Sequence, residues 1–142
     1  MMRHLHSRSL TLLLLTTLAC TPRGPSVKGQ ETPSAKLALE FAKAMASGDT
    51  ARAHGMLSPE LQSVLAPEKL AAQYGEMVGD GSGAPTTIQV MTTMDAWPDK
   101  QGSDVEWVYV AIASDAYSEA VTVVVSQAKS GLVIRSIEWG RP

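Results

Sequence analysis

The sequence predicts an α+β domain in which three to four N-terminal helices pack on a curved four-stranded antiparallel sheet. Residues 34–78 carry apolar side chains at helical spacing, whereas residues 88–139 form short alternating segments rich in valine and isoleucine. A glycine-rich break at residues 79–85 separates the two halves. Because the connections between strands are too short for a parallel crossover, we expect an antiparallel meander.

A proline or a capping side chain marks the start of each predicted helix. The first helix starts at Thr32 or Ser34, around Pro33, and its apolar residues recur every three or four positions. The next helix is short and is expected to run through Leu57. This second helix is expected to start at Asp49-Thr50, and the two helices after it at Ser58-Pro59 and Ala66-Pro67.

Four segments are predicted as strands, namely residues 88–97, 105–114, 119–128 and 132–139. Asp115-Ala116 is expected to close a hairpin between the second and third strands. In the first strand, strict alternation predicts two faces. Ile88, Val90 and Met94 form one face, and Gln89, Thr93 and Asp95 form the other.

Alternation in the two central strands separates a core face from an outer face. Trp107 and Tyr109 fall on the outer face, together with Thr122 and Ser126. Two interpretations of the aromatic pair stand: a partner or second subunit buries it, or the rings flatten against neighbouring strands. The core face is expected to hold the aliphatic set Val108, Val110, Ile112, Val121, Val123 and Val125.

Arg135 is an unusual residue for the last strand. Strict alternation places it on the face shared by Val133, Ile137 and Trp139. Two roles are open. It lines a cavity as an anion ligand, or its stem lies on apolar surface while its charge reaches the rim.

The first nineteen residues are typical of an export signal. Arg3 and Arg8 give residues 1–9 a positive charge without any acid, and residues 10–18 contain only leucine and threonine. This apolar stretch would rise only about 14 Å as a helix, too short for a hydrocarbon core of roughly 30 Å. Met1–Ala19 is therefore predicted to be a signal peptide.

The next residues resemble the lipobox of bacterial lipoproteins. Thr17-Leu18-Ala19-Cys20 matches this motif except that Thr17 stands where leucine is usual. The resemblance implies that Cys20 carries a diacylglycerol thioether, with palmitate-type chains, and anchors the protein in the cell envelope. Because Cys20 is the only cysteine, no internal disulfide is possible, and lipid attachment accounts for the unpaired thiol. The absence of aspartate at position 21 implies the periplasmic side of the outer membrane in preference to the inner membrane.

Residues 20–33 are predicted to form a lipidated tether. The segment has three prolines and two glycines, so it buries no core, and fully extended it would reach roughly 45 Å. Without the signal, ten basic and fourteen acidic residues remain, a net charge near −4. Nucleic acid is therefore disfavoured as a partner, because neutralising phosphates needs a basic surface.

Catalytic and metal-binding motifs do not stand out in residues 34–142. His54 is the only histidine after the signal, too few for a metal centre or a nucleophilic triad, and it is interpreted as a half-packed polar residue. Asp95 and Tyr109 are the residue types that an isomerase cavity uses, but alternation directs Asp95 to solvent. No cofactor is expected.

The helical half resembles the nuclear-transport-factor-2-like superfamily, cone-shaped domains that include ketosteroid isomerases. The resemblance rests on residues 42–53, on Leu57-Ser58-Pro59-Glu60-Leu61 and on Ile137-Glu138-Trp139. It implies that residues 34–142 form one such domain. The sequence as a whole favours a non-enzymatic envelope lipoprotein that binds a ligand, a second copy or another envelope protein. The alternative is a small-molecule enzyme of isomerase or hydrolase type that uses the cone's cavity.

Overall fold

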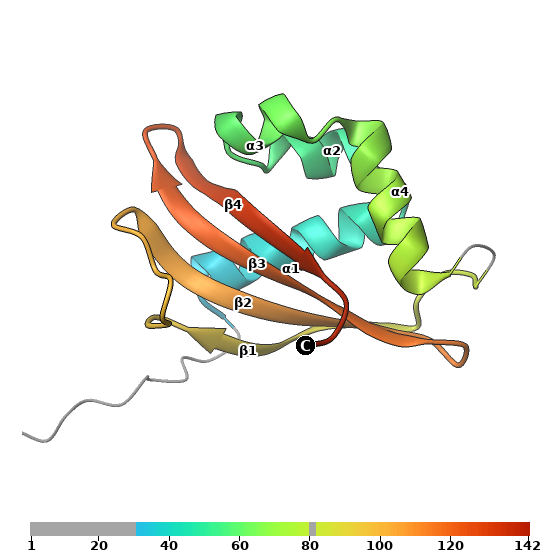
Figure 1. The fold of residues 1–142 in the computed structure, drawn as a ribbon. Helices are drawn as coiled ribbons and strands as arrows, with labels where there is room; N and C mark the ends of the chain where they lie inside the picture. Colours follow the sequence, from blue (N-terminus) through green and yellow to red (C-terminus); the bar gives the residue numbers. More distant parts are fainter. Residues whose placement is uncertain (1–30, 80–81) are drawn as a thin grey trace, which may run out of the picture.

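The computed structural model describes residues 31–79 and 82–142. Within them, helices precede strands along the chain (Figure 1), which confirms the predicted α+β class. The predicted signal peptide, Cys20 and the tether up to residue 30 lie outside the described residues. None of the described helices has both the length and the apolar character needed to cross a membrane. The elements are α1 (Pro33–Ala46), α2 (Thr50–Gly55), α3 (Pro59–Val64), α4 (Pro67–Val78), β1 (Thr87–Met94), β2 (Asp104–Ala113), β3 (Ser118–Ala128) and β4 (Gly131–Trp139).

The start of α1 is fixed by a side-chain cap. The Thr32 hydroxyl accepts a hydrogen bond from the Ala35 amide at 3.0 Å, and Pro33 is the first helical residue. The same hydroxyl donates to the buried carboxylate of Glu106 on β2. The fold thus includes Thr32 and Pro33, which lie inside the segment predicted as tether.

Backbone pairing with the sheet ends α2 at Gly55, before its predicted end at Leu57. The Ile134 amide donates to the Met56 carbonyl at 2.9 Å, and the Ser58 amide donates to the Ile134 carbonyl at 2.8 Å. This parallel bridge holds the chain against the outer edge of β4, so α3 begins beside that strand.

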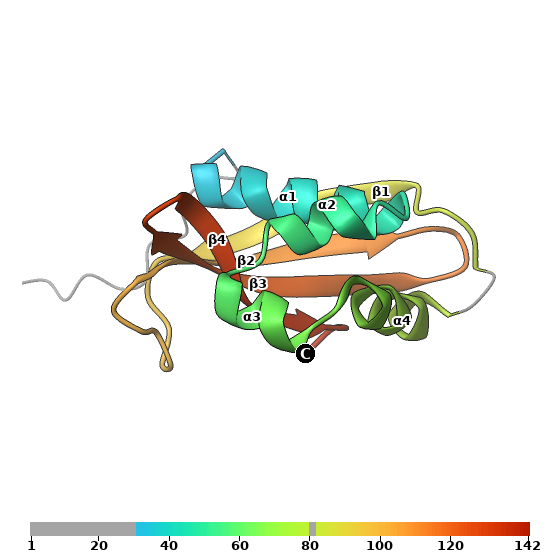
Figure 2. The same cartoon turned by 90° about the horizontal axis from the view of Figure 1, so that it is seen from above.

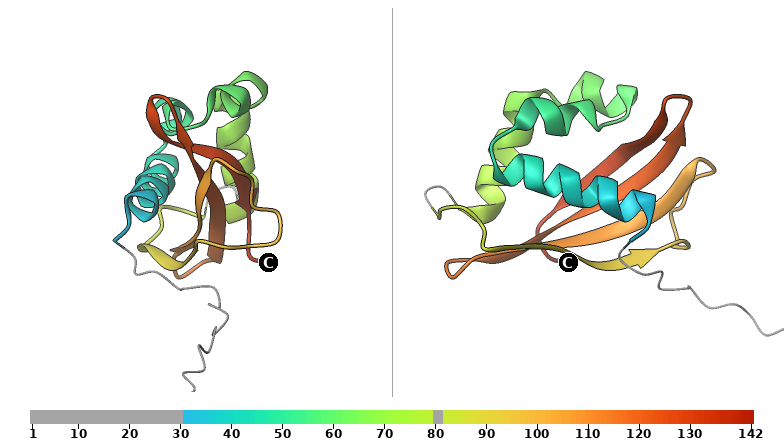
Figure 3. Two further views of the ribbon diagram at one scale, coloured as in Figure 1. Left: turned by 90° about the vertical axis from the view of Figure 1, so that its left-hand side faces the viewer. Right: turned by 180° about the vertical axis from the view of Figure 1, so that it is seen from behind.

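The strands form the predicted meander, with the order β1-β2-β3-β4 and antiparallel pairing throughout. α1 lies behind the sheet in Figure 1 and in front of it in the right panel of Figure 3. Seen from above, α1 runs along β1 and β2 (Figure 2). α1 therefore packs on one face of the sheet (Figures 2 and 3).

That inner face carries the core. All six aliphatic residues predicted for it are fully buried, which confirms the assignment of the two central strands. The Trp139 ring lies 6.0 Å from the Phe41 ring of α1 and 6.1 Å from the Tyr74 ring of α4. The end of β4 therefore joins both helices, and apolar side chains fill the space between them and the sheet.

The predicted alternation of the first strand is wrong in its second half. Met91 is an extra residue that has no partner on β2, so the pairing resumes one residue later. Such a bulge moves every later side chain to the opposite face. Thr93 is consequently fully buried opposite Val108, and Met94 lies on the outer face opposite Trp107.

The first strand also ends at Met94 and not at residue 97. Pro98 has no amide to donate and disfavours a continued ladder. The chain turns instead, with the Lys100 amide donating to the Trp97 carbonyl at 3.3 Å. The Lys100 ammonium lies 5.3 Å from the centre of the Trp97 ring.

Candidate functional site

An ion pair between Asp104 and Arg135 lies on the outer side of the sheet. Arg135 Nε donates to Asp104 Oδ1 at 2.6 Å, and Arg135 Nη2 donates to Oδ2 at 2.8 Å. The Asp104 side chain is fully buried, whereas the Arg135 side chain is 28% exposed. Two parallel bonds fix the guanidinium plane, so one of its edges faces the carboxylate and another faces away from it.

Two bulges bring these residues together. Val105 is an extra residue on β2. On β4 the extra residue is Arg135, because the adjacent residues Val124 and Val125 of β3 pair with Ser136 and Ile134. The prediction that Arg135 shares a face with Ile137 is therefore wrong. Ile137 packs on the core, whereas the bulge turns Arg135 to the outer side.

Further donors converge on Asp104. The Ser126 hydroxyl donates to Oδ1 at 2.6 Å, and the Gln101 amide donates to Oδ2 at 2.8 Å. Burial raises the pKa of the Asp104 carboxyl, but the hydrogen bonds from Arg135, Ser126 and Gln101 and the charge of Arg135 outweigh burial and lower the pKa to about 2. Asp104 is therefore ionised at neutral pH.

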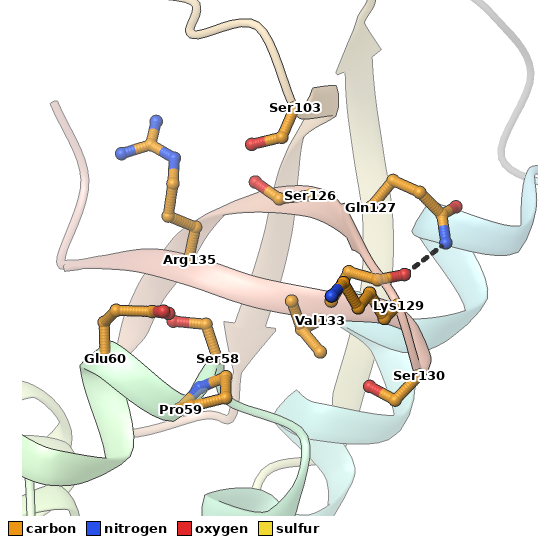
Figure 4. Close-up of a pocket in the computed structure, with 11 residues that line it drawn as sticks. Ser58, Pro59, Glu60, Ser103, Ser126, Gln127, Lys129, Ser130, Val133 and Arg135 are labelled. Carbon is orange, nitrogen blue, oxygen red and sulfur yellow. Dashed lines mark hydrogen bonds between the residues drawn. The ribbon is translucent and has the colours of Figure 1, made fainter.

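A groove of about 470 Å³ runs between α3 and the outer side of the β3–β4 hairpin (Figure 4). Arg135 and Ser103 lie on one side of it in this view, and the start of α3 lies on the other. An adjoining hollow of about 520 Å³ shares Arg135 with it and adds the apolar residues Leu61 and Val64 of α3. The groove is lined by Ser58, Pro59, Glu60, Ser103, Ser126, Gln127, Ala128, Lys129, Ser130, Val133 and Arg135.

Trp107 and Tyr109 form a stacked pair on the outer face of β2. Their ring centroids lie 6.1 Å apart at an interplanar angle of 11°, and both side chains are half-buried. Their cross-strand partners on β3, Val124 and Thr122, are buried although both lie outside the core beneath the helices. The rings therefore flatten over β3 and still present part of their surface to solvent.

The remaining residues singled out from the sequence lie apart. Asp95 follows the end of β1 and is half-buried. Tyr109 lies on the face opposite the core, so the two side chains do not share a cavity on the core face. His54 is half-buried, with Nε2 3.4 Å from the Gln62 carbonyl. Residues 31–79 and 82–142 contain no group of three side chains suited to a metal ion.

The chain was compared with protein-family models, with curated proteins and with solved structures. None of them matches. The assignment of function therefore depends on the geometry of the outer face and of the groove.

Sequence reasoning identified Arg135 but missed its partner Asp104 and the serines around it. Asp104 stands at the start of a strand after a turn, where acidic residues are common. Only the two bulges reveal the pairing, and they depend on contacts between strands. A charged residue of each sign near the same end of two strands is the one signal that the sequence offers.

Proposed function

We propose that this chain is a lipid-anchored protein of the cell envelope, of non-enzymatic binding or scaffold type, with the fold of a nuclear-transport-factor-2-like domain. Its proposed partner is a second copy of the chain, bound through the outer face of the sheet around Trp107 and Tyr109. The observation that carries the proposal is the stacked aromatic pair on the face opposite the core.

The composition of this face favours a second copy. Met94, Thr92, Val124 and Thr122 surround the aromatic pair by strand pairing, and none of them is charged. Uncharged residues around two rings can face a second copy across a two-fold axis without like-charge repulsion, and two-fold axes are the commonest symmetry of protein oligomers. A lipid anchor at Cys20 would confine the copies to one plane and raise their effective concentration.

The inner face of the sheet, which carries the core, offers less support for a ligand site. Phe41, Leu70 and Ile134 are fully buried there, together with the aliphatic residues of β2 and β3. Binding surfaces are therefore expected on the outside of the domain.

Sedimentation of wild-type and Trp107→Ala proteins tests the proposal. We expect Trp107→Ala to weaken self-association by roughly 2 kcal/mol, because Trp and Tyr are typical interface hot spots. The melting temperature should fall only slightly, since the ring is half-buried. Val64→Ala is the matched control, because Val64 is 70% exposed on α3, and this variant should associate like the wild type.

Two outcomes would contradict self-association through the aromatic pair. A monomeric wild-type protein at membrane-like concentrations, or a Trp107→Ala variant that melts far below the wild type with association unchanged, would show that the pair serves the fold alone.

A further inference from the structure

The guanidinium of Arg135 retains hydrogen-bonding capacity after its pairing with Asp104. Arginine has five N–H donors in one plane. The bonds to Asp104 use Nε and one hydrogen of Nη2, and Nη1 has no hydrogen-bond partner among the described residues. The edge formed by Nη1 and Nη2 has the geometry that binds a second carboxylate through two bonds.

The surroundings hold that edge in place. Asp104 is fully buried and is itself fixed by Ser126 and Gln101, so the guanidinium has little freedom to turn. Arg135 lines both the groove and the adjoining hollow. A preorganised cation at a concave surface binds an anion without the entropy cost of ordering a mobile side chain.

The residues that line the groove and the hollow are mostly polar, but each of these two sites also has apolar side chains. Val133 and Pro59 line the groove, and Leu61 and Val64, one helical turn apart on α3, line the hollow. Val64 is 70% exposed, the most exposed large apolar side chain of the described residues. A fixed cation next to apolar side chains suits a ligand that has an anionic head and a hydrocarbon chain.

We propose that the groove between α3 and the β3–β4 hairpin binds a small aliphatic monocarboxylate. Its carboxylate would accept bonds from the Nη1–Nη2 edge of Arg135, and its chain would lie along Val133, Leu61 and Val64. Two other charged side chains line the groove: Lys129 supplies a second positive charge, and Glu60 supplies a negative one that opposes the ligand's head. This site is separate from the aromatic pair and does not depend on self-association.

Titration of the full chain with hexanoate tests the proposal. Binding is measured by the NMR signals of the valine methyl groups and of the Arg135 Nε–H. Hexylammonium and hexanol are probes of the same length with opposite and no charge. We expect saturable hexanoate binding that shifts the Val64 and Val133 signals, and at least roughly tenfold weaker binding of the other two probes, the difference expected from one charge-assisted pair.

Two variants locate the carboxylate. Arg135→Lys keeps a positive charge beside Asp104 but loses the planar edge, so it should weaken hexanoate binding roughly tenfold. Glu60→Gln removes the opposing charge and should strengthen binding. Arg52→Lys, an exposed arginine on α2, is the matched control and should bind like the wild type.

Retained affinity in Arg135→Lys, or equally tight binding of hexanol, would overturn the proposal. If Arg135→Lys does not fold, Glu60→Gln decides alone, because Glu60 is exposed and makes no hydrogen bond through its side chain within the described residues. Stronger hexanoate binding in that variant supports the site, and unchanged binding refutes it.

Discussion

Asp104 connects three separate parts of the chain through one carboxylate. Gln101 belongs to the loop before β2, Ser126 to β3 and Arg135 to β4, and each donates a hydrogen bond to it. A buried carboxylate without such donors would be costly, because transfer from water removes its hydration. The cluster therefore stabilises the register of β2, β3 and β4 at the end of the sheet where the groove lies.

The pKa of Asp104 leads to a prediction about acid stability. Its pKa is about 2 in the folded protein against an ordinary value of 3.8, so ionised Asp104 stabilises the fold above pH 4. This stabilisation is lost as the pH falls from about 4 to 2. Linkage gives a loss of about 2 kcal/mol. Urea unfolding between pH 7 and pH 2 should show this extra loss in the wild type and not in Asp104→Asn.

The difference between the two proteins is the informative quantity, since other carboxylates titrate in both. Parallel curves of unfolding free energy against pH would contradict the expected role of Asp104. At pH 7 the variant should be the less stable of the two, because Arg135 loses its ionic partner.

How far the sequence predicts structure depends on whether the deciding interactions are local. The starts of α1 and α3 were predicted within about one residue, because Thr32 and Ser58 cap amides only three residues away. The outer position of Trp107 followed from simple alternation, which holds through most of β2. These features depend on the immediate neighbours in the chain.

The bulges were not predicted, because they depend on pairing between strands distant in sequence. Met91 bears no mark that distinguishes it from an ordinary strand residue, and yet it reverses the faces of Thr93 and Met94. The bulge at Arg135 has the same effect on β4 and places the side chain beside Asp104. The sequence alone therefore does not predict the groove, because its position depends on the register of the sheet.

The contacts of Thr32 predict where the folded domain begins. A chain that begins at Thr32 keeps the cap of α1 and the contact with Glu106, so its stability should lie within about 0.5 kcal/mol of a chain that begins at Thr21. A chain that begins at Ser34 loses both and should lose roughly 1–2 kcal/mol, as for a deleted N-cap. Urea unfolding of the three chains measures this.

Equal stability of the chains that begin at Thr32 and Ser34 would show that the cap contributes nothing. A non-cooperative transition for the chain that begins at Thr32 would instead place part of residues 21–31 within the fold.

The aromatic pair and the groove both lie on the outer side of the sheet. The sheet lies between α1 (Figure 2) and the aromatic pair, and the groove opens at the edge where α3 meets β4. The described fold begins at Thr32, and the proposed tether precedes it along the chain. Fully extended, residues 20–31 would reach roughly 40 Å from the lipid. This reach would allow two anchored copies to bring their outer faces together above one membrane.

The proposed lipid anchor depends on the thiol of Cys20. The resemblance of Thr17-Leu18-Ala19-Cys20 to a lipobox implies a thioether at Cys20, and serine has no thiol to alkylate. We therefore expect Cys20→Ser to abolish metabolic labelling with palmitate and to leave the protein uncleaved or soluble. Two or three acyl chains hold a protein durably on a bilayer, at about 0.8 kcal/mol per buried methylene. Their loss should also disperse the copies and weaken crosslinking through the Trp107 face in cells.

Thr21→Ser is the matched control and should be labelled and partition like the wild type. Palmitate labelling of Cys20→Ser, together with normal recovery in the membrane fraction, would refute the proposed anchor.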